Sequence, residues 1–430
     1  MTSIPKDFKV AIVGGGMCGL LCAVGLARSG IQVDVFESAQ KFEEIGAGVG
    51  LGPNAVRALD GLGVLEAVLR HADSPTPNQL PFRFLAGVGK HEHVYLASTG
   101  KSAPLFSVVT QQHSRLFRPA FLQALEPLID PSVIHFRKRC VSISDSNSGT
   151  HLLHFEGGLV HEADLIIGAD GIRSVIRSFV DPEKSSRVVY VNSISYRSLL
   201  PPQLLDHAGV KTDLTTHPLC WVGEDKHLIT YPVQANKMIN IVTCSTNSQV
   251  PVGSVTVPLP WSRPASQDEM LEVYSGWGDD ATTLLKQIKN PSKWFLHYLH
   301  PPLKSYVRRK VVLVGDAAHA MLPHLAAGVG QGFEDVFVLC KLLGHPQTNA
   351  ANLDVILEAY NNIRVPRANM IIQRSFDMGK IYQGYRDTED STPETQRRLM
   401  GMWEPVWHHD LAREVASVVK DIYGGQESSL

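Results

Sequence analysis

The sequence predicts an α/β protein in which a parallel sheet, assembled from distant segments, carries an inserted antiparallel sheet and is followed by C-terminal helices. Three observations predict this fold class. Apolar, strand-like segments that end in glycines or in Gly-Asp occur within residues 8–37, 163–169 and 310–316. Longer segments of alternating character, typical of antiparallel strands with one solvated face, lie between the last two. Helical spacing prevails beyond residue 329.

The first 70 residues predict a βαβ unit followed by a helix. Residues 8–13 and 32–37 are rich in β-branched side chains and predict strands. Residues 17–29 between them have the length and apolar content of a helix. A strand, a glycine-rich turn, a helix and a second strand within 30 residues imply a parallel sheet with a right-handed crossover. Residues 53–70 predict another helix after a second glycine-rich loop.

The middle of the chain predicts strands of two kinds. Residues 163–169 and 310–314 predict buried strands of the parallel sheet, and each runs into an Asp. Residues 188–200 and 226–242 predict longer strands, and their alternation favours antiparallel pairing. Residues 245–268, rich in Ser, Pro and Val, predict a loop or an edge strand.

Helices are predicted at residues 329–345, 352–384 and 403–423, where Pro366 and Pro405 are expected to kink or delimit two of them. The positions of the two strand types then predict a cofactor domain that is interrupted by a substrate domain. The expected divisions are a first part of the cofactor domain at 1–180 with a small substrate-side excursion near 75–110, an antiparallel substrate domain at 181–295, the last part of the cofactor domain at 296–345, and a C-terminal helical region at 346–430.

Composition excludes several classes of protein. The 430 residues include 40 Lys and Arg against 42 Asp and Glu, with 44% apolar residues, so an ordinary globular chain with a small-molecule partner is expected and nucleic-acid binding is not. Six cysteines without a C-x-x-C pair indicate neither a zinc knuckle nor a disulfide scaffold. Glycines interrupt the apolar stretch 10–27, so we expect no membrane span and a cytoplasmic location.

A glycine motif between the first predicted strand and helix indicates a dinucleotide site. In Gly14-x-Gly16-x-x-Gly19 the first glycine permits the turn, the second lets the backbone approach a pyrophosphate, and the third allows close helix packing. Glu37 closes the second strand, where an acid can bind ribose hydroxyls. The motif alone leaves NAD and FAD open.

Two later segments place an acid at the end of a strand. Asp316 begins a loop that runs to Gly328 before a predicted helix, a position from which its carboxylate could accept hydrogen bonds from sugar-alcohol hydroxyls. Asp170 is followed by Gly171 in the same way. A turn or a helix cap is the alternative for either acid.

These three motifs, in this order, resemble those of the single-component FAD-dependent aromatic hydroxylases. Residues 45–48 and 330–335 are similar to the subgroup of salicylate hydroxylase and of fungal phenol hydroxylases and dearomatases. The resemblance implies the para-hydroxybenzoate hydroxylase-like fold, with a Rossmann-like FAD-binding domain. It also implies FAD as cofactor and NAD(P)H as co-substrate.

The resemblance implies which residues of this chain contact the cofactor. It implies that Glu37 binds the adenosine ribose and that Asp316 lies beside the pyrophosphate and ribityl chain. It also implies that Asp170 serves both FAD and NAD(P)H. Arg118 matches a flavin-contacting arginine, although Ala120 stands where an acid is usual. The remaining cofactor contacts that we expect are made by backbone: Gly14, Gly16, Gly19, Gly50, Gly328 and Val329.

Two side chains on the predicted substrate sheet are candidate catalytic residues. In the family a flavin C4a-hydroperoxide transfers oxygen to a phenolate, so cationic and hydroxyl donors are wanted near the flavin. Arg197 lies on a strand with one buried face, where a charge is costly unless it is paired or functional. Tyr231 lies on a neighbouring predicted strand. A surface arginine and a packing tyrosine are the alternatives.

The sequence therefore predicts an FAD-dependent monooxygenase that uses NAD(P)H and O2 to hydroxylate a phenolic substrate, including a hydroxybenzoate that would lose CO2. Dearomatisation of a phenol, an NAD-dependent dehydrogenase and a non-catalytic flavin-binding protein are the alternatives. The 18 histidines, among them His319 and His324 near the Asp316 loop, show no zinc-like spacing with acids or cysteines, so no metal is expected. We expect a monomer or a homodimer.

Overall fold

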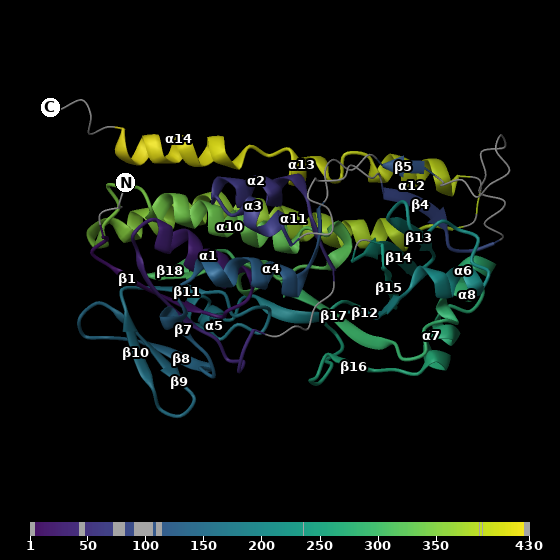
Figure 1. Ribbon diagram of the computed structural model, residues 1–430, viewed down its shortest axis with the longest axis horizontal. Helices are drawn as coiled ribbons and strands as arrows, with labels where there is room; N and C mark the ends of the chain where they lie inside the picture. The colour runs from purple at the N-terminus through teal and green to yellow at the C-terminus, as the bar shows by residue number, and fades with distance from the viewer. Residues whose placement is uncertain are drawn as a thin grey trace.

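The computed structural model describes residues 5–42, 48–71, 82–89, 106–108, 114–234, 236–386, 388 and 390–424. Two main sheets lie side by side along the long axis of the molecule (Figure 1). Long helices run across the same side of both sheets. The fold is α/β, as the sequence predicts.

The first main sheet has six strands and is assembled from distant parts of the chain. Its strands, in spatial order, are β18 (Val307–Arg308), β19 (Val311–Leu313), β11 (Leu165–Gly168), β1 (Lys9–Val13), β2 (Gln32–Phe36) and β7 (Ile134–His135). All neighbours pair in parallel except β18 with β19. Helix α1 (Met17–Arg28) crosses from β1 to β2, which confirms the predicted βαβ unit.

The second main sheet has eight strands. In spatial order they are β16 (Ser262–Pro264), β17 (Ser292–His300), β12 (Arg187–Leu200), β15 (Met238–Thr246), β14 (Lys226–Val233), β13 (Leu219–Gly223), β4 (Phe82–Ala86) and β5 (Phe106–Val108). Pairing is antiparallel throughout except between β13 and β4. Smaller sheets are formed by β8 (Cys140–Asp145), β9 (His151–Phe155) and β10 (Val160–Ala163), and by β3 (Gly48–Leu51) with β6 (Ser114–Phe117).

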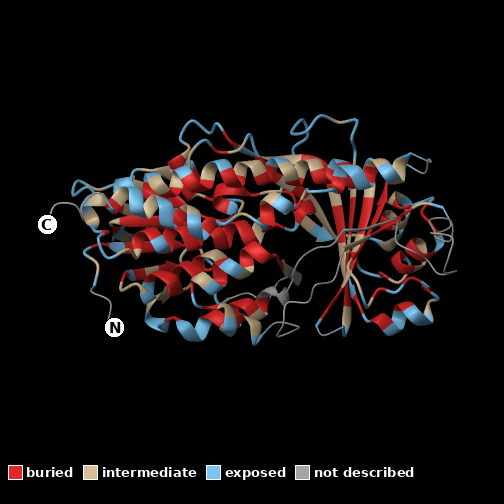
Figure 2. Ribbon diagram, turned by 90° about the horizontal axis from the view of Figure 1, so that it is seen from above, coloured by how far each residue is buried: buried red, intermediate tan, exposed pale blue. Residues whose placement is uncertain are grey.

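The two faces of the eight-stranded sheet are covered by different elements. Trp221 and Leu228 point to one face and pack with Tyr274 and Leu284 of the helices α6 (Pro202–His207), α7 (Gln267–Val273) and α8 (Asp279–Leu285). Cys220 points to the other face, which we call the inner face, together with the other buried side chains that pack against α11 (Leu353–Tyr382). The strands are accordingly mostly buried in Figure 2.

Helix α11 joins the two halves of the protein. Its first half packs in the core of the six-stranded sheet, and its second half packs on the inner face of the eight-stranded sheet. The other helices are α2 (Pro53–Gly61), α3 (Leu65–Leu69), α4 (Arg118–Leu125), α5 (Ile176–Val180), α9 (Asp316–His319), α10 (Gly328–Leu343), α12 (Ser391–Leu399), α13 (Glu404–Trp407) and α14 (Leu411–Tyr423). No described helix is long and apolar enough to cross a membrane.

Three predicted elements are wrong in their extent. The predicted strand 226–242 is a hairpin of β14 and β15, because Gln234 and Asn236 adopt left-handed φ angles of 54° and 66° and reverse the chain. The predicted helix 53–70 breaks into α2 and α3 at Gly63, whose φ is 70°. The predicted helix 403–423 is likewise two helices, α13 and α14.

Pro366 does not end a helix, although proline interrupts the hydrogen-bond ladder. It lies inside the 30-residue helix α11. Arg364 and Arg367, on either side of it, each make four hydrogen bonds to groups outside α11. These tertiary contacts hold the helix on both sides of the proline.

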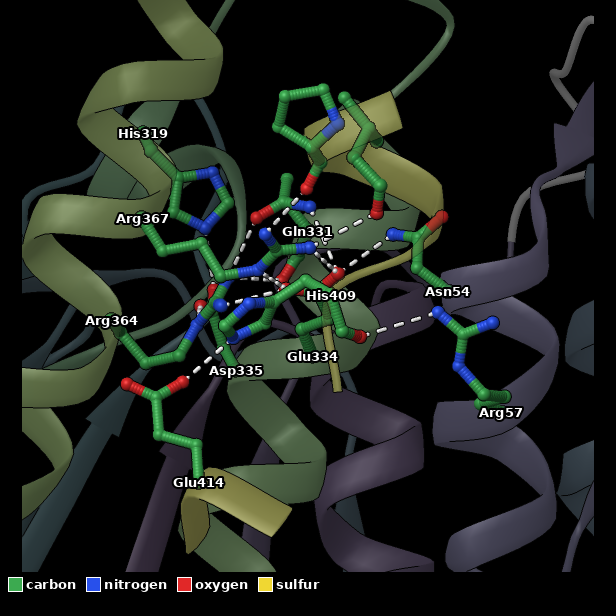
Figure 3. A network of polar contacts seen from close by, with 12 residues as sticks. Asn54, Arg57, His319, Gln331, Glu334, Asp335, Arg364, Arg367, His409 and Glu414 are labelled. Atoms are coloured by element: carbon green, nitrogen blue, oxygen red, sulfur yellow. Dashed lines mark hydrogen bonds and ion pairs between the residues drawn. The ribbon is translucent and has the colours of Figure 1, made fainter. Parts of the chain in front are cut away.

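A cluster of buried charges connects α11 with α10 (Figure 3). Arg364 Nε lies 2.7 Å from Asp335 Oδ1, and Arg364 Nη1 lies 2.7 Å from Glu334 Oε2. Arg367 binds both carboxylate oxygens of Glu334, at 2.6 and 2.7 Å. Burial by itself raises the pKa values of both acids, but the pKa values are lowered overall. Arg364 and Arg367 outweigh burial at Glu334, and His319 and Arg364 outweigh it at Asp335. Both acids are therefore ionised, and each charge is balanced inside the core.

The same cluster reaches three further segments. Asn54 at the start of α2 donates to Glu334 Oε1 at 2.7 Å. Asp335 Oδ2 accepts from the backbone N–H of Gly315 at 2.8 Å and contacts His319 Nε2 at 2.5 Å. Arg367 donates to the backbone carbonyls of Pro405 and Val406 in α13, at 2.9 and 3.0 Å. One buried network therefore fixes α2, the Gly315 loop and α13 relative to α10 and α11.

Replacing Arg364, one of the two arginines of this cluster, should strongly destabilise the fold. We expect Arg364→Leu to lower the free energy of unfolding by about 3–5 kcal/mol, because Glu334 and Asp335 lose a buried counter-charge. Arg386→Leu, which breaks an exposed pair with Glu224, should cost less than about 1 kcal/mol. Urea denaturation of the two variants checks this, and equal losses would contradict it.

Candidate functional site

The glycine loop between β1 and α1 has no room for side chains at two of its three positions. Gly14 has a φ of 105°, and a Cβ there would lie 2.4 Å from the carbonyl oxygen of Ala169. A Cβ at Gly19 would lie 1.9 Å from the carbonyl oxygen of Gly14. Gly16 is different, because it has an ordinary φ of −74° and a Cβ there would meet nothing within 4 Å. Open space therefore adjoins the loop at the N-terminus of α1.

Glu37 is held beside this loop by backbone donors. Its Oε2 accepts from the N–H of Gly15 at 2.7 Å, and its Oε1 accepts from the N–H of Ala39 at 2.7 Å. Ser38 Oγ also donates to Oε1, at 3.1 Å. A carboxylate has about four lone-pair sites, so Oε2 can accept a further hydrogen bond. The side chain is thus oriented by the chain and still able to accept from a hydroxyl group.

Asp170 both caps a helix and keeps one oxygen without a partner. Its Oδ2 accepts from the N–H groups of Val175 and Ile176 at the start of α5, at 2.7 and 3.2 Å. Its Oδ1 is buried and has no hydrogen-bond partner among the described residues. Burial raises the pKa of this carboxyl. The cap explains one oxygen, and the other is left to accept from a ligand.

Asp316 is exposed at the first position of α9. Gly315 before it has a φ of 63°, and a Cβ there would lie 2.9 Å from Cys18 Sγ of α1. The N–H of Gly315 donates to Asp335, so the buried cluster supports this loop from below. The acid is therefore fixed in position by its neighbours while its own carboxylate faces outward.

The other predicted cofactor contacts lie on two loops that meet. Gly50 lies on β3 opposite Arg115 of β6, and Gly328 and Val329 begin α10. A Cβ at Gly330 would lie 3.0 Å from the side-chain amide of Asn54, so the segment after β3 lies against the N-terminal turn of α10. Arg118 is the first residue of α4, and its side chain lies outside the described part of the chain.

The structure brings most of these residues to one edge of the six-stranded sheet. Gly14, Glu37, Asp170 and Asp316 follow β1, β2, β11 and β19, whose carboxyl ends lie together because these strands are parallel. Ligands of open α/β sheets bind at this edge. The open space at Gly16, the helix N-terminus behind it and the free oxygen of Asp170 fit a dinucleotide cofactor.

The two candidate catalytic residues lie on the inner face of the eight-stranded sheet. Arg197 of β12 pairs with Val242 of β15, and Tyr231 of β14 pairs with Asn240, two residues further along β15. Residues two apart on a strand share a face, so Arg197 and Tyr231 point to the same side. Strand β14 also lies beside β6, which pairs with the strand that carries Gly50.

Arg197 is partly buried, and its Nε is enclosed by the protein. Its Nε has no hydrogen-bond partner among the described residues, and its guanidinium lies 4.7 Å over the ring of Trp294. Burial lowers the pKa of Arg197, while the nearby Tyr231 hydroxyl acts in the opposite direction. A guanidinium remains charged in proteins, so this face presents a cation to which an anion can bind.

The sequence pointed to His324 as a residue that could line the site, but it did not predict His227, which lies beside it. His227 of β14, four residues before Tyr231, is buried, and its ring lies 5.2 Å from that of His324 in a T-shaped arrangement. Burial lowers the pKa of His324 to about 4, and burial together with the nearby His324 lowers the pKa of His227 well below its usual value. Both imidazoles are therefore neutral at neutral pH. The even spacing of His227 and Tyr231 on one strand was the available signal.

The second half of α11 holds His324 in place. Tyr382 donates to the carbonyl oxygen of His324 at 3.2 Å, and Gln383 lies with its amide nitrogen 3.4 Å from His227 Nδ1. A Cβ at Gly379 would lie 2.5 Å from the imidazole of His324, so only glycine fits there. No group of three or more His, Cys, Asp or Glu residues in the described ranges could hold a metal ion.

Comparisons with known proteins agree over nearly the whole chain. A family model described as FAD binding domain matches residues 7–375. A salicylate hydroxylase of Pseudomonas putida is 37% identical over 423 residues, which cover 95% of this chain and 94% of that protein. A 6-methylsalicylate 1-monooxygenase of Aspergillus terreus is 30% identical over 444 residues, 98% of this chain and 94% of that protein. A solved salicylate hydroxylase substrate complex has a TM-score of 0.84 and 31% identity, covering 96% of this chain and 98% of its own.

The glycine loop predicts opposite outcomes for two alanine substitutions. Gly19→Ala should destabilise the chain itself, because its Cβ would collide with Gly14. Gly16→Ala should leave the free energy of unfolding of the apoprotein unchanged and weaken FAD binding about tenfold or more, because its Cβ enters only the open space. Thermal melting of the apoproteins and a flavin titration check this, and a stable Gly16→Ala protein with full affinity would contradict it.

The buried histidine predicts a pH dependence of stability. His324 has a pKa of about 4 in the folded chain against 6.5 when unfolded, so the unfolded state binds the proton more readily. Its contribution to stability is complete above pH 6.5 and is lost as the pH falls toward 4, up to about 3 kcal/mol.

We expect His324→Gln to show a smaller loss of stability than the parent between pH 7 and pH 4.5, as measured by denaturant titration at each pH. His408→Gln, at an exposed histidine that pairs with Glu404, is the control and should follow the parent curve. An unchanged pH profile for His324→Gln would contradict the assignment.

Proposed function

The chain belongs to the FAD binding domain family, and within it we propose that the protein hydroxylates a phenol that carries a carboxylate ortho to its hydroxyl, of the salicylate type. Its near full-length similarity to salicylate hydroxylases makes it an FAD-dependent aromatic hydroxylase that uses NAD(P)H and O2. The names of two relatives, salicylate hydroxylase and 6-methylsalicylate 1-monooxygenase, support the ortho-hydroxybenzoate.

We assign the cofactor site to the edge of the six-stranded sheet. Gly14, Gly16 and Gly19 with the N-terminus of α1 would hold the FAD pyrophosphate, and Glu37 would hold the adenosine ribose. Asp316 would bind beside the pyrophosphate and ribityl chain, and Asp170 would use its unpaired oxygen. Gly50, Gly328, Val329 and Arg118 would line the flavin side. FAD reduced by NAD(P)H supplies the activated oxygen.

The inner face supplies what the aromatic substrate needs. The observation that carries this assignment is the guanidinium of the partly buried Arg197, whose buried Nε has no partner among the described residues. We propose that Arg197 binds the substrate anion and that Tyr231 orients the phenolic oxygen. A phenolate is more electron-rich than a phenol, and a cation beside it favours ionisation.

We further propose that the neutral pair His227 and His324 receives the phenolic proton. Both imidazoles are unprotonated at neutral pH, and neither is occupied by a carboxylate among the described residues. A base in a water-poor site can accept a proton only if it is neutral beforehand, which their lowered pKa values ensure. His324 keeps an Nδ1 without a partner in the described part of the chain.

The proposed reaction is a decarboxylative hydroxylation. One atom of O2 bonds to the ring carbon that bears the carboxylate, the bond to the carboxylate breaks, and CO2 leaves. The other oxygen atom leaves as water, with the two electrons supplied by NAD(P)H. The dehydrogenase and the non-catalytic alternatives leave the inner-face cation and the histidine pair without a role.

The test is a screen of phenols and hydroxybenzoates for stimulated NAD(P)H oxidation by the FAD-loaded protein, with products and CO2 identified by mass. We expect salicylate-type substrates to give a catechol and CO2. Hydroxylation that retains the carboxylate, or stimulation only by phenols without one, would contradict the proposal.

The matching variant is Arg197→Ala. It should raise KM for the hydroxybenzoate at least tenfold and leave bound FAD unchanged, because one charged hydrogen bond contributes about 1.5–3 kcal/mol. Arg187→Ala, at the exposed start of the same strand, is the control and should keep the parent KM. An unchanged KM in Arg197→Ala would remove this residue from the site.

A further inference from the structure

The inner face carries several buried polar atoms that no described residue pairs. Ser195 Oγ, Arg197 Nε and Asn240 Nδ2 are buried and have no hydrogen-bond partner among the described residues. Asn240 is only 4% exposed to solvent, and Ser195 is 1% exposed. More than nine in ten buried polar groups in proteins are hydrogen-bonded. Arg197 Nε and Asn240 Nδ2 lie on the face that carries Tyr231, where a bound ligand can pair them.

The strand register places Asn240 beside the two candidate catalytic residues. Asn240 lies directly opposite Tyr231 on β14, and Val242 lies opposite Arg197 on β12. In a sheet, opposite residues have Cβ atoms about 4.5–5.5 Å apart, and diagonal neighbours are about 7–8 Å apart. Asn240, Tyr231 and Arg197 therefore share one patch of the inner face, with Asn240 adjacent to both of the others.

The chemistry of the unpaired atoms restricts the ligand. An amide nitrogen and a guanidinium nitrogen can donate hydrogen bonds but cannot accept them. A ligand group that satisfies both must supply at least two acceptor sites, and a carboxylate does so best, with two oxygens, about four lone-pair sites and a charge opposite to that of Arg197. A second hydroxyl group would supply fewer acceptor sites and would bring a donor of its own.

We propose that Asn240 is a substrate-binding residue whose side-chain N–H donates to the carboxylate of the aromatic substrate, next to Arg197. The inference rests on the proposed function and deepens it. An ortho-hydroxybenzoate presents three oxygens along one edge of its ring, two from the carboxylate and one from the phenol. Arg197 and Asn240 offer donors for the carboxylate, and Tyr231 lies directly opposite Asn240 on the same patch of the sheet. Asn240 thus distinguishes a hydroxybenzoate from a phenol that lacks the carboxylate.

The experiment compares two phenols that differ at a single ring position. Salicylate and 2-methylphenol differ in having a carboxylate or a methyl group at the same ring position. Their dissociation constants are measured by titrating the absorbance of the FAD-loaded protein, without NAD(P)H, for the parent and for Asn240→Ala and Asn240→Asp. We expect Asn240→Ala to weaken salicylate binding about tenfold and 2-methylphenol binding less than about twofold. Asn240→Asp should weaken salicylate binding further, because it opposes one anion with another.

The matched control is Thr230→Val. Thr230 Oγ1 is also buried without a hydrogen-bond partner in the described ranges, but residue 230 follows Ile229 on β14 and so points to the opposite face. This variant should bind both ligands as the parent does. Melting temperatures are measured for every variant, so that a change in ligand binding is separated from a loss of folding.

The outcomes separate this inference from the proposed function. If the parent binds neither salicylate nor another ortho-hydroxybenzoate, the proposed function fails, and the role of Asn240 fails with it. If the parent binds salicylate and Asn240→Ala binds it equally well, only the role of Asn240 is overturned. Equal weakening of salicylate and 2-methylphenol would also overturn it, because a structural role affects both ligands alike.

Discussion

The arrangement of the whole protein depends on a cluster of buried charges between α10 and α11. Glu334 and Asp335 are adjacent in sequence, and each is ionised inside the core because Arg364 and Arg367 compensate it. Such a cluster tolerates little displacement, since a buried charge that loses its partner costs several kcal/mol. The cluster also reaches the backbone of Gly315, just before Asp316, and the side chain of Asn54. The segments that carry the predicted flavin contacts are thereby positioned from the interior, while their outward surfaces stay available to a ligand.

The charged groups of the α10–α11 cluster have hydrogen-bond partners, whereas donors on the inner face do not have one among the described residues. In the cluster, the carboxylates accept from arginine or asparagine side chains and from backbone, and the arginines also reach the carbonyls of α13. On the inner face, Arg197 and Asn240 keep donors without a partner among the described residues. Both regions are buried, so burial alone does not explain the difference. A fold that pairs its charges so completely in one place and leaves donors unpaired in another is better explained by a ligand than by imperfect packing.

Much of the fold was predictable because its signals are local. The residues of β1, the turn and α1 are consecutive in sequence, so their pattern is visible there. A Cβ at Gly14 or Gly19 would collide with backbone, which explains why the turn has glycine at these positions. The hairpin of β14 and β15 was missed because the turn at Gln234 and Asn236 uses left-handed conformations without glycine. Pro366 was misleading because arginines on either side of it fix the helix through tertiary contacts. In the candidate site, Arg197 and Tyr231 were predicted from the strand pattern and the family resemblance. His227 and Asn240 were not, because their proximity to Arg197 and Tyr231 follows from strand register, which no local motif encodes.

The charge state of the inner face favours one anion rather than two. Arg197 supplies a single positive charge, while the desolvated imidazoles of His227 and His324 are neutral at neutral pH. A bound ortho-hydroxybenzoate carries one negative charge on its carboxylate, which Arg197 balances. Loss of the phenolic proton would create a second negative charge in a region of low dielectric, and this is unfavourable unless the proton stays close by. A neutral histidine that takes up that proton becomes a cation, so the net charge of the site is unchanged. The low pKa values that burial imposes on the histidines are therefore consistent with their role as acceptors, because substrate binding supplies the anion that raises them.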